Sequence, residues 1–133
     1  MKRTEINRVL LVDDDHVYKM MVEYLFHHFY PEIEIHSVME PDQVVQALKD
    51  FTPQILILDV NLPIQSGWEV LDEIEKELKM AGLKKPFIVM SSSSIGLDDK
   101  EMAKSRSIVN TYLEKPLTYD KLKELIREYS IEF

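Results

Sequence analysis

The chain has 133 residues, no cysteine, 45% hydrophobic residues and a formal net charge of −8. This length suits one domain with a real core, the lack of cysteine excludes disulfides and thiolate sites, and the acidic balance disfavours direct binding of nucleic acid, which needs a basic surface. No apolar run approaches the roughly 20 residues of a membrane span, and no signal-peptide core follows the first residues, so we expect a cytoplasmic protein without membrane association.

The first third of the chain predicts a strand, a helix and a second strand. Residues 9–12 form an apolar run that ends in three acids, as in a buried strand. From His16 the hydrophobic period becomes helical, and the face expected to point inward carries Val17, Met21, Tyr24, Leu25 and His28. Pro31 ends this helix. Residues 33–36 then alternate in polarity, which is typical of an edge strand with one wet side.

The middle of the chain predicts two helices around the most apolar strand. Pro41 can open a short helix whose inward residues would be Val44, Val45 and Leu48. Residues 55–58 are four uninterrupted apolar residues that run into Asp59, so this strand should be covered on both faces. An amphipathic helix follows, closed near Gly82, with the inward residues Trp68, Val70, Leu71, Ile74 and Leu78.

The last third predicts two strands and two helices. Residues 87–90 form a strand that runs into four serines, 91–94, and a weaker, more polar helix follows from about Leu97 to Lys104. Residues 111–114 form a short strand that meets Lys115. Thr118 is suited to cap a final helix, whose apolar stripe would be Leu122, Leu125, Ile126 and Tyr129.

Five strands that alternate with five helices predict an α/β fold with a single parallel sheet, covered by helices on both faces and joined by right-handed crossovers. We see no linker and no internal repeat. We therefore expect one domain over residues 1–133, with a core over about 7–130 and no separate output domain.

Polar groups end four of these strands. The carboxyl ends of parallel strands meet at one edge of a sheet, where α/β proteins bind their ligands, so that edge should collect Asp13, Asp14, Asp15, Asp59, Ser91, Ser92 and Lys115. Crowded carboxylates repel one another unless a cation intervenes, and oxygen ligands suit a hard ion such as Mg²⁺. Acids, a divalent cation, an ammonium and a hydroxyl are suited to phosphoryl transfer, with Asp59 as the nucleophile.

At these residues the chain resembles the receiver domains of response regulators, over roughly residues 7–130. The matching features are the acidic pair Asp13–Asp14, Asp59 with Asn61, Pro63 and Gly67 behind it, the hydroxyl of Ser91, the aromatic Tyr112, and Lys115–Pro116. The resemblance implies a doubly wound, flavodoxin-like sheet of strand order 2-1-3-4-5, with a proline at position 116 that is usually cis.

The resemblance also implies a function and a site. A histidine kinase or histidine phosphotransfer protein would donate a phosphoryl group to Asp59, assisted by Lys115 and Ser91. Asp14, Asp59 and the Asn61 carbonyl, completed by Asp13, would hold Mg²⁺ or Mn²⁺. Ser91 and Tyr112 would switch the conformation, and an unidentified downstream protein would bind the face formed by the 97–104 helix, the 111–114 strand and the last helix. Such a protein is a regulator whose only catalysis is its own phosphorylation and dephosphorylation.

Other interpretations are also compatible with parts of the pattern. Ser107–Thr111 replaces the small residues that usually precede the fifth strand in this family, so the resemblance does not predict the backbone conformation of this loop. An isolated Asp59 could be a strand-end cap, and Asp15 fits an N-cap better than a ligand. An aspartyl phosphatase would need a second acid at the position of Asn61. A flavodoxin would need a phosphate loop with glycines, which the serine run lacks. A degenerate receiver would act only as a docking module, but the intact Asp59 and Lys115 argue against it.

Overall fold

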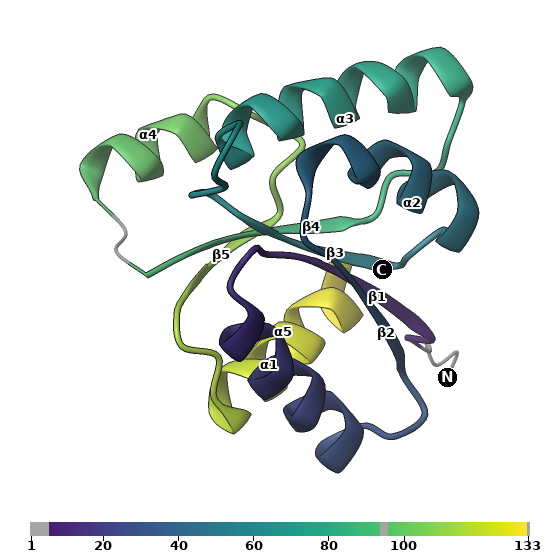
Figure 1. Ribbon diagram of the computed structural model, residues 1–133, viewed down its shortest axis with the longest axis vertical. Coiled ribbons are helices and arrows are strands. Elements are labelled where there is room, and N and C mark those ends of the chain that lie inside the picture. Colours follow the sequence, from purple (N-terminus) through teal and green to yellow (C-terminus); the bar gives the residue numbers. More distant parts are fainter. Residues whose placement is uncertain (1–5, 94–95, 133) are drawn as a thin grey trace.

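The computed structural model describes residues 6–93 and 96–132, and these form one parallel sheet between two layers of helices (Figure 1). The strands are β1 (Arg8–Val12), β2 (Glu34–Val38), β3 (Ile55–Asp59), β4 (Phe87–Ser92) and β5 (Thr111–Glu114). Their spatial order is β2-β1-β3-β4-β5, and every pairing is parallel. The predicted fold class and strand order are confirmed.

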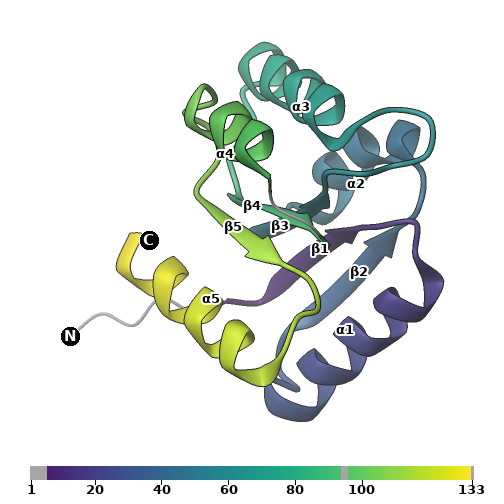
Figure 2. The ribbon, with the colours of Figure 1, turned by 90° about the vertical axis from the view of Figure 1, so that its left-hand side faces the viewer.

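The helices lie on opposite faces of this sheet (Figure 2). One face is covered by α1 (His16–Phe29) and α5 (Tyr119–Glu132), and the other by α2 (Val44–Phe51), α3 (Gly67–Ala81) and α4 (Leu97–Lys104). A short 3-10 turn, η1 (Pro41–Gln43), leads into α2. No described helix is long and apolar enough to cross a membrane.

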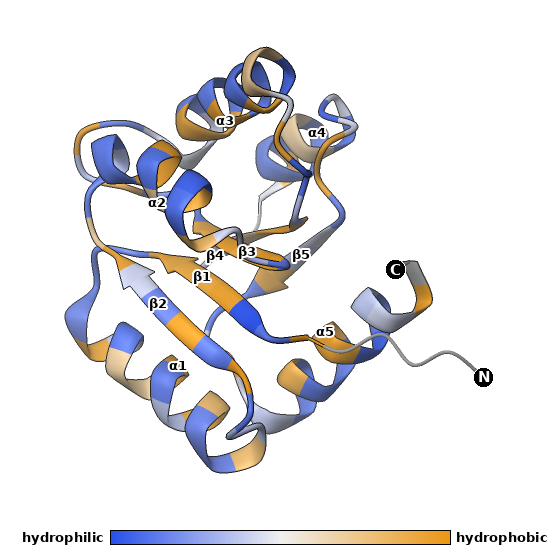
Figure 3. Ribbon diagram, turned by 90° about the vertical axis from the view of Figure 1, so that its right-hand side faces the viewer, coloured by the Kyte–Doolittle hydropathy of each residue, from blue (hydrophilic) through white to orange (hydrophobic). Residues whose placement is uncertain are grey.

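The central strands are apolar because helices cover both of their faces. All five residues of β3 and all six of β4 are buried, whereas β2 at the sheet edge alternates between buried and exposed residues at its start. Figure 3 shows this contrast in the colours of β1 and β3 against those of β2. Continuous apolar runs therefore marked the centre of the sheet correctly, and alternation marked its edge.

Most helix predictions are confirmed, including the inward residues of α3 and its end near Gly82, where the structure shows a left-handed C-cap. In α2, Val44 and Leu48 are buried and Val45 is half-buried. The stripe of α5 is also confirmed, with Ile126 half-buried, and the Thr118 hydroxyl accepts a hydrogen bond from the Lys121 amide at 3.2 Å. Ser94, the last of the four serines, lies outside the described residues, and the N-cap of α4 is Gly96.

The predicted inward face of α1 is wrong. Val17 and Tyr24 are 76% and 62% exposed, Met21 and His28 are also exposed, and only Leu25 is partly buried. The buried residues are instead Tyr18, Val22 and Phe26, which pack against α5 and the sheet. Two apolar stripes lie side by side on this helix, and its neighbours in the fold select the second one.

Candidate functional site

The carboxyl ends of the strands bring the predicted polar residues together. Asp13 follows β1 directly, Asp59 is the last residue of β3, and Ser91 lies opposite it in the register of β4. All three side chains belong to buried residues, with 1%, 4% and 1% exposure. Buried polar groups at one edge of an α/β sheet mark this edge as the functional end of the molecule.

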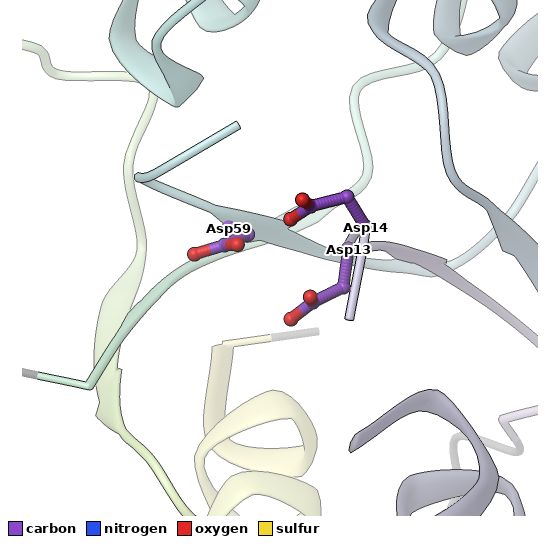
Figure 4. Close-up of side chains that lie close together, drawn as sticks. All are labelled: Asp13, Asp14 and Asp59. Atoms are coloured by element: carbon purple, nitrogen blue, oxygen red, sulfur yellow. The ribbon is translucent and has the colours of Figure 1, made fainter. Parts of the chain in front are cut away.

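Three carboxylates form the acidic part of this site (Figure 4). Asp13, Asp14 and Asp59 each offer an oxygen atom, and these atoms lie within 4.8 Å of one another. Asp14 is exposed to solvent, whereas the other two are buried. A set of oxygen ligands that is open to water on one side fits a hard divalent cation such as Mg²⁺, which keeps several of its own waters.

Lys115 supplies the positive charge of the site. Its Nζ lies 2.6 Å from Asp13 Oδ2 and 3.4 Å from Asp59 Oδ2, and it sits 4.5 Å above the centre of the Tyr18 ring. Burial alone would lower the pKa of Lys115, but the ion pair with Asp13 and the nearby Asp59 outweigh burial and raise that pKa. The ammonium is thus held charged between two carboxylates. The Lys115–Pro116 peptide bond is cis, as the resemblance implied.

Burial makes the ionised form of Asp59 costly. Burial and then the charge of Asp13 raise its pKa to about 6, although Lys115 and the Asn61 amide, which donates to Asp59 Oδ1 at 3.2 Å, oppose this. A carboxylate with a raised pKa gains from any added cation. This supports the interpretation of the three acids as a metal site.

The Ser91 hydroxyl is a buried donor without a good partner. It has the Tyr18 hydroxyl nearby but makes no hydrogen bond of normal geometry with any described residue. An unpaired buried hydroxyl costs free energy unless a ligand completes it. Because Ser91 lies opposite Asp59 in the sheet, this hydroxyl belongs to the same edge as the buried carboxylate.

The chain behind Asp59 is fixed by close backbone packing. The Gly67 amide donates to the Val60 carbonyl at 2.7 Å, and a Cβ atom at position 67 would lie 2.2 Å from the Asp59 carbonyl oxygen. Only glycine fits this approach. Gly67, which the sequence singled out by its place in the motif, is therefore needed to seat the start of α3 behind the acid.

Tyr112 lies apart from the acidic cluster, on the side of α4. Its hydroxyl donates to the Asp99 carbonyl of α4, and its ring meets that of Trp68 edge-on at 6.2 Å. Burial, and to a lesser degree Asp99, raises the pKa of Tyr112 to about 12. The predicted switch residue thus joins β5 to α4 and not to the acids.

Arg106 connects the end of α4 to α3. Its guanidinium pairs with both carboxylate oxygens of Asp72 at 3.0 and 3.1 Å and lies 5.3 Å from the centre of the Trp68 ring. It also donates to the Met102 carbonyl at 3.3 Å. Sequence reasoning gave this residue no role because its partners lie 34 positions away or depend on the placement of α4.

Tyr18 is the site residue that sequence reasoning missed. It is buried, its hydroxyl accepts a hydrogen bond from the Leu117 amide at 3.2 Å, and its ring lies under Lys115. The spacing of Tyr18, Val22 and Phe26 was the available signal, but the neighbouring stripe was equally apolar. Asp15 is the N-cap of α1, as expected, and accepts from the Tyr18 amide at 3.1 Å.

Comparison with known proteins decides the family. The sequence model of the response regulator receiver domain family matches residues 9–127, which is most of the chain. The chain belongs to this family. Its phosphatase and flavodoxin interpretations are thereby set aside, and the acidic edge described above is the acidic pocket of a receiver domain.

Among curated relatives, the chain is 28% identical over 126 residues to a probable methanogenesis regulatory protein FilR2 of Methanothrix harundinacea, covering 90% of this chain and 79% of that protein. It is 27% identical over 115 residues to the cell cycle response regulator CtrA of Brucella ovis, covering 86% of this chain but only 46% of CtrA. The chain thus spans less than half the length of CtrA.

Solved structures agree with the fold. A two-component response regulator from Cytophaga hutchinsonii superposes with a TM-score of 0.83 at 27% identity, over 95% of this chain and 98% of that one. The chemotaxis protein CheY4 of Vibrio cholerae gives 0.79 at 19% identity, over 94% and 99%. The receiver domain is thus a regulator of two-component signalling, a class whose members interact with histidine kinases or phosphotransfer proteins.

Proposed function

We propose that this receiver domain is a phosphorylation-dependent switch that accepts a phosphoryl group on Asp59 from a histidine kinase or a histidine phosphotransfer protein. The observation that carries the proposal is the position of Asp59, buried at the end of β3, 3.4 Å from the Lys115 ammonium and within the acidic cluster. The expected place of action is the cytoplasm. The net charge of −8 favours a protein target over nucleic acid.

In the transfer, a carboxylate oxygen of Asp59 attacks the phosphorus of phosphohistidine. The phosphorus–nitrogen bond breaks, and its electron pair stays on the histidine nitrogen. Lys115 would neutralise the equatorial oxygens, and Ser91 would donate its unpaired hydroxyl to one of them. Water attack on the resulting aspartyl phosphate would use the same groups, so dephosphorylation is also expected to be self-catalysed.

Asp13, Asp14 and Asp59, with the Asn61 backbone carbonyl, would hold Mg²⁺ or Mn²⁺. When bound, the ion supplies positive charge that offsets the charge on the phosphoryl oxygens. The residues of the chain do the remaining work. Asp13 keeps Lys115 in place at 2.6 Å, and Gly67 seats the loop behind the acceptor.

Output would pass through the face formed by α4, β5 and α5. A phosphoryl group carries up to about two negative charges and strong acceptor oxygens, and these would draw in Ser91 and Lys115. Movement of Ser91 vacates space beside β5, into which the Tyr112 ring could turn after it releases the Asp99 carbonyl. The position of α4 would then change, and with it the surface offered to a downstream protein.

Acceptance is tested by incubation with acetyl phosphate or phosphoramidate and Mg²⁺, followed by intact mass. The wild type should gain one acid-stable, base-labile phosphoryl group, and Asp59→Asn should gain none. Asp42→Asn, an exposed acid in η1, is the matched control and should react like the wild type. The same adduct on Asp59→Asn would move the acceptor elsewhere.

The relay is tested by amide resonances before and after phosphorylation. Ser91→Ala should still accept the phosphoryl group but fail to shift the amides of about 94–112. In Lys115→Ala, the charge added by phosphorylation should likewise fail to produce the conformational change. Wild-type shifts in phosphorylated Ser91→Ala would exclude the relay and leave direct recognition of the phosphorylated edge as the output.

A further inference from the structure

A cavity lies at the opposite edge of the sheet from the acidic site, beside the amino ends of β1, β3 and β4. These strand ends are at right in Figure 1. Its volume is about 340 Å³, within the range of roughly 300–1,000 Å³ that small-molecule sites occupy. It is bounded by the start of β1, the loops before β3 and β4, and one residue each of α2, α3 and α5. None of its lining residues belongs to the acidic pocket.

The charge of this cavity opposes that of the whole chain. Arg8, Lys84 and Lys85 line it, and no lining residue is an acid, although acids outnumber bases by 24 to 16 in the sequence. Cations gathered without carboxylates create a positive potential that attracts anions. The two ends of the sheet therefore carry opposite charges, and the amino end is suited to a negatively charged group.

Arg8 is the best-placed anion ligand. Its Nε donates to the Thr52 carbonyl at 3.2 Å, and among the described residues its two terminal nitrogens have no partner. Thr52 adopts a left-handed conformation with φ of 46°, uncommon for a β-branched residue, and offers its carbonyl to Arg8 in this conformation. One side of the guanidinium is thus anchored while the other presents the paired donors that suit carboxylate, sulfonate or phosphate oxygens.

The rest of the lining is apolar or already hydrogen-bonded. Leu48, Leu78 and Leu83 form an apolar wall. On the polar side, Gln54 accepts from the Arg8 amide at 3.1 Å and donates to the Tyr129 hydroxyl at 3.3 Å. A ligand of this cavity therefore needs an apolar body for the leucines as well as an anionic end for Arg8.

We propose that this cavity is a binding site for small organic anions with an apolar body, such as aromatic or alkyl carboxylates, sulfonates and phosphates. Arg8 binds the anionic group, Lys84 at the exposed rim adds attraction, and the leucines hold the apolar body. The site is separate from Asp59 and does not depend on its phosphorylation.

The test uses anilinonaphthalene sulfonate as the probe, with binding followed by fluorescence and by amide resonances of the full chain. Saturable binding below about 1 mM is expected, with the largest shifts at residues 7–8, 52–54 and 83–86. Arg8→Gln should weaken binding about tenfold, the usual size of a lost charge-assisted contact, and Lys84→Gln by a few-fold. Arg127→Gln and Lys104→Gln are the matched controls and should bind as the wild type does.

Two further ligands separate the requirements of the site. N-phenyl-1-naphthylamine has the same apolar body without the sulfonate and should bind at least about tenfold more weakly, while inorganic phosphate, an anion without an apolar body, should produce much smaller shifts. The proposal is overturned by undiminished binding to both Arg8→Gln and Lys84→Gln, by equal binding of the uncharged amine, by shifts confined to the exposed face of α1, or by no binding. Because Lys84 is exposed, its variant is expected to fold even if Arg8→Gln does not.

Discussion

Helices α3 and α4 cover the same face of the sheet (Figure 2), yet they are held there by different forces. Helix α3 buries Trp68, Val70, Leu71, Ile74 and Leu78, whereas α4 has no buried residue. Helix α3 also has a side-chain N-cap from Ser66 and a glycine C-cap, while Gly96 gives α4 no side-chain cap. Burial holds α3, and α4 relies on half-buried Met102 and Ala103 with a few polar contacts.

This difference indicates where the molecule can change shape. Among the described residues, two polar contacts connect α4 to its neighbours: the Tyr112 hydroxyl donates to the Asp99 carbonyl, and Arg106, which pairs with Asp72 of α3, donates to the Met102 carbonyl. Polar contacts near the surface can be exchanged for water at a net cost of about 1 kcal/mol each, whereas moving a buried leucine costs several times more. Helix α3 is therefore the more firmly held of the two, and α4 is the helix whose displacement should cost less, as the proposed output requires.

The largest effect is expected when leucine is replaced by alanine in each of the two helices. Leu71 of α3 is fully buried and Leu97 of α4 is 79% exposed. We expect Leu71→Ala to lower the free energy of unfolding by about 3 kcal/mol, because it leaves a cavity, and Leu97→Ala by less than about 0.5 kcal/mol. Urea unfolding measures both. Equal losses would mean that α4 is packed as tightly as α3.

The next largest effect concerns the charge of Asp59 at the acidic edge of the sheet. The pKa of Asp59 is raised to about 6 in the folded protein, from an ordinary value of 3.8. The folded state therefore binds more protons than the unfolded state between these values, and stability falls as the pH rises through this window. In the presence of a metal chelator, the free energy of unfolding of Asp59→Asn should be about 2 kcal/mol higher than that of the wild type at pH 7. Below pH 4 the two should differ little.

Urea unfolding across pH 4 to 8 tests this expectation. Asp42→Asn removes an exposed charge and should keep the wild-type profile. A profile for Asp59→Asn that still falls between pH 4 and 6 would assign the titration to another group.

Added Mg²⁺ should affect the two helices differently, because the proposed metal site lies among the carboxylates of the acidic edge and includes no residue of α4. At ten times its dissociation constant we expect a gain of about 1.4 kcal/mol in the free energy of unfolding. Slower amide exchange should appear at the ends of β1 and β3, with none in α4. Asp14→Ala should lose most of this response, and sodium chloride of equal ionic strength is the control. A full response in the variant would show that Asp14 is not a ligand of the metal.

The smallest global effect is expected from the link between the two helices. Arg106 is mostly buried but Asp72 is 55% exposed, so Arg106→Ala should cost less than about 1 kcal/mol. Its local effects should be clearer: faster amide exchange in α4 and altered emission of Trp68, the single tryptophan in the sequence. Asp72→Asn should act in the same direction, and Arg127→Ala should do neither. Unchanged exchange in α4 would show that Arg106 does not hold this helix.

Much of the fold and the site could be predicted because their signals are local. The buried strands are short apolar runs, and a polar residue that follows such a run must lie at the carboxyl edge of a parallel sheet. Asp13, Asp59, Ser91 and Lys115 were placed at that edge for this reason. The helix positions followed from periodicity, and even the weak α4 was predicted within its observed bounds.

The strands and the residues of the acidic edge could thus be predicted from the sequence, and the family resemblance added the strand order. The three-dimensional structure was needed to show which stripe of α1 is buried, that Tyr18 lies under Lys115, that Arg106 joins α4 to α3, and that Arg8 and Lys84 line one cavity. The physical reason is that periodicity is a property of one segment, whereas burial and pairing depend on neighbours far along the chain. Two equally apolar stripes differ only in what the fold places against them.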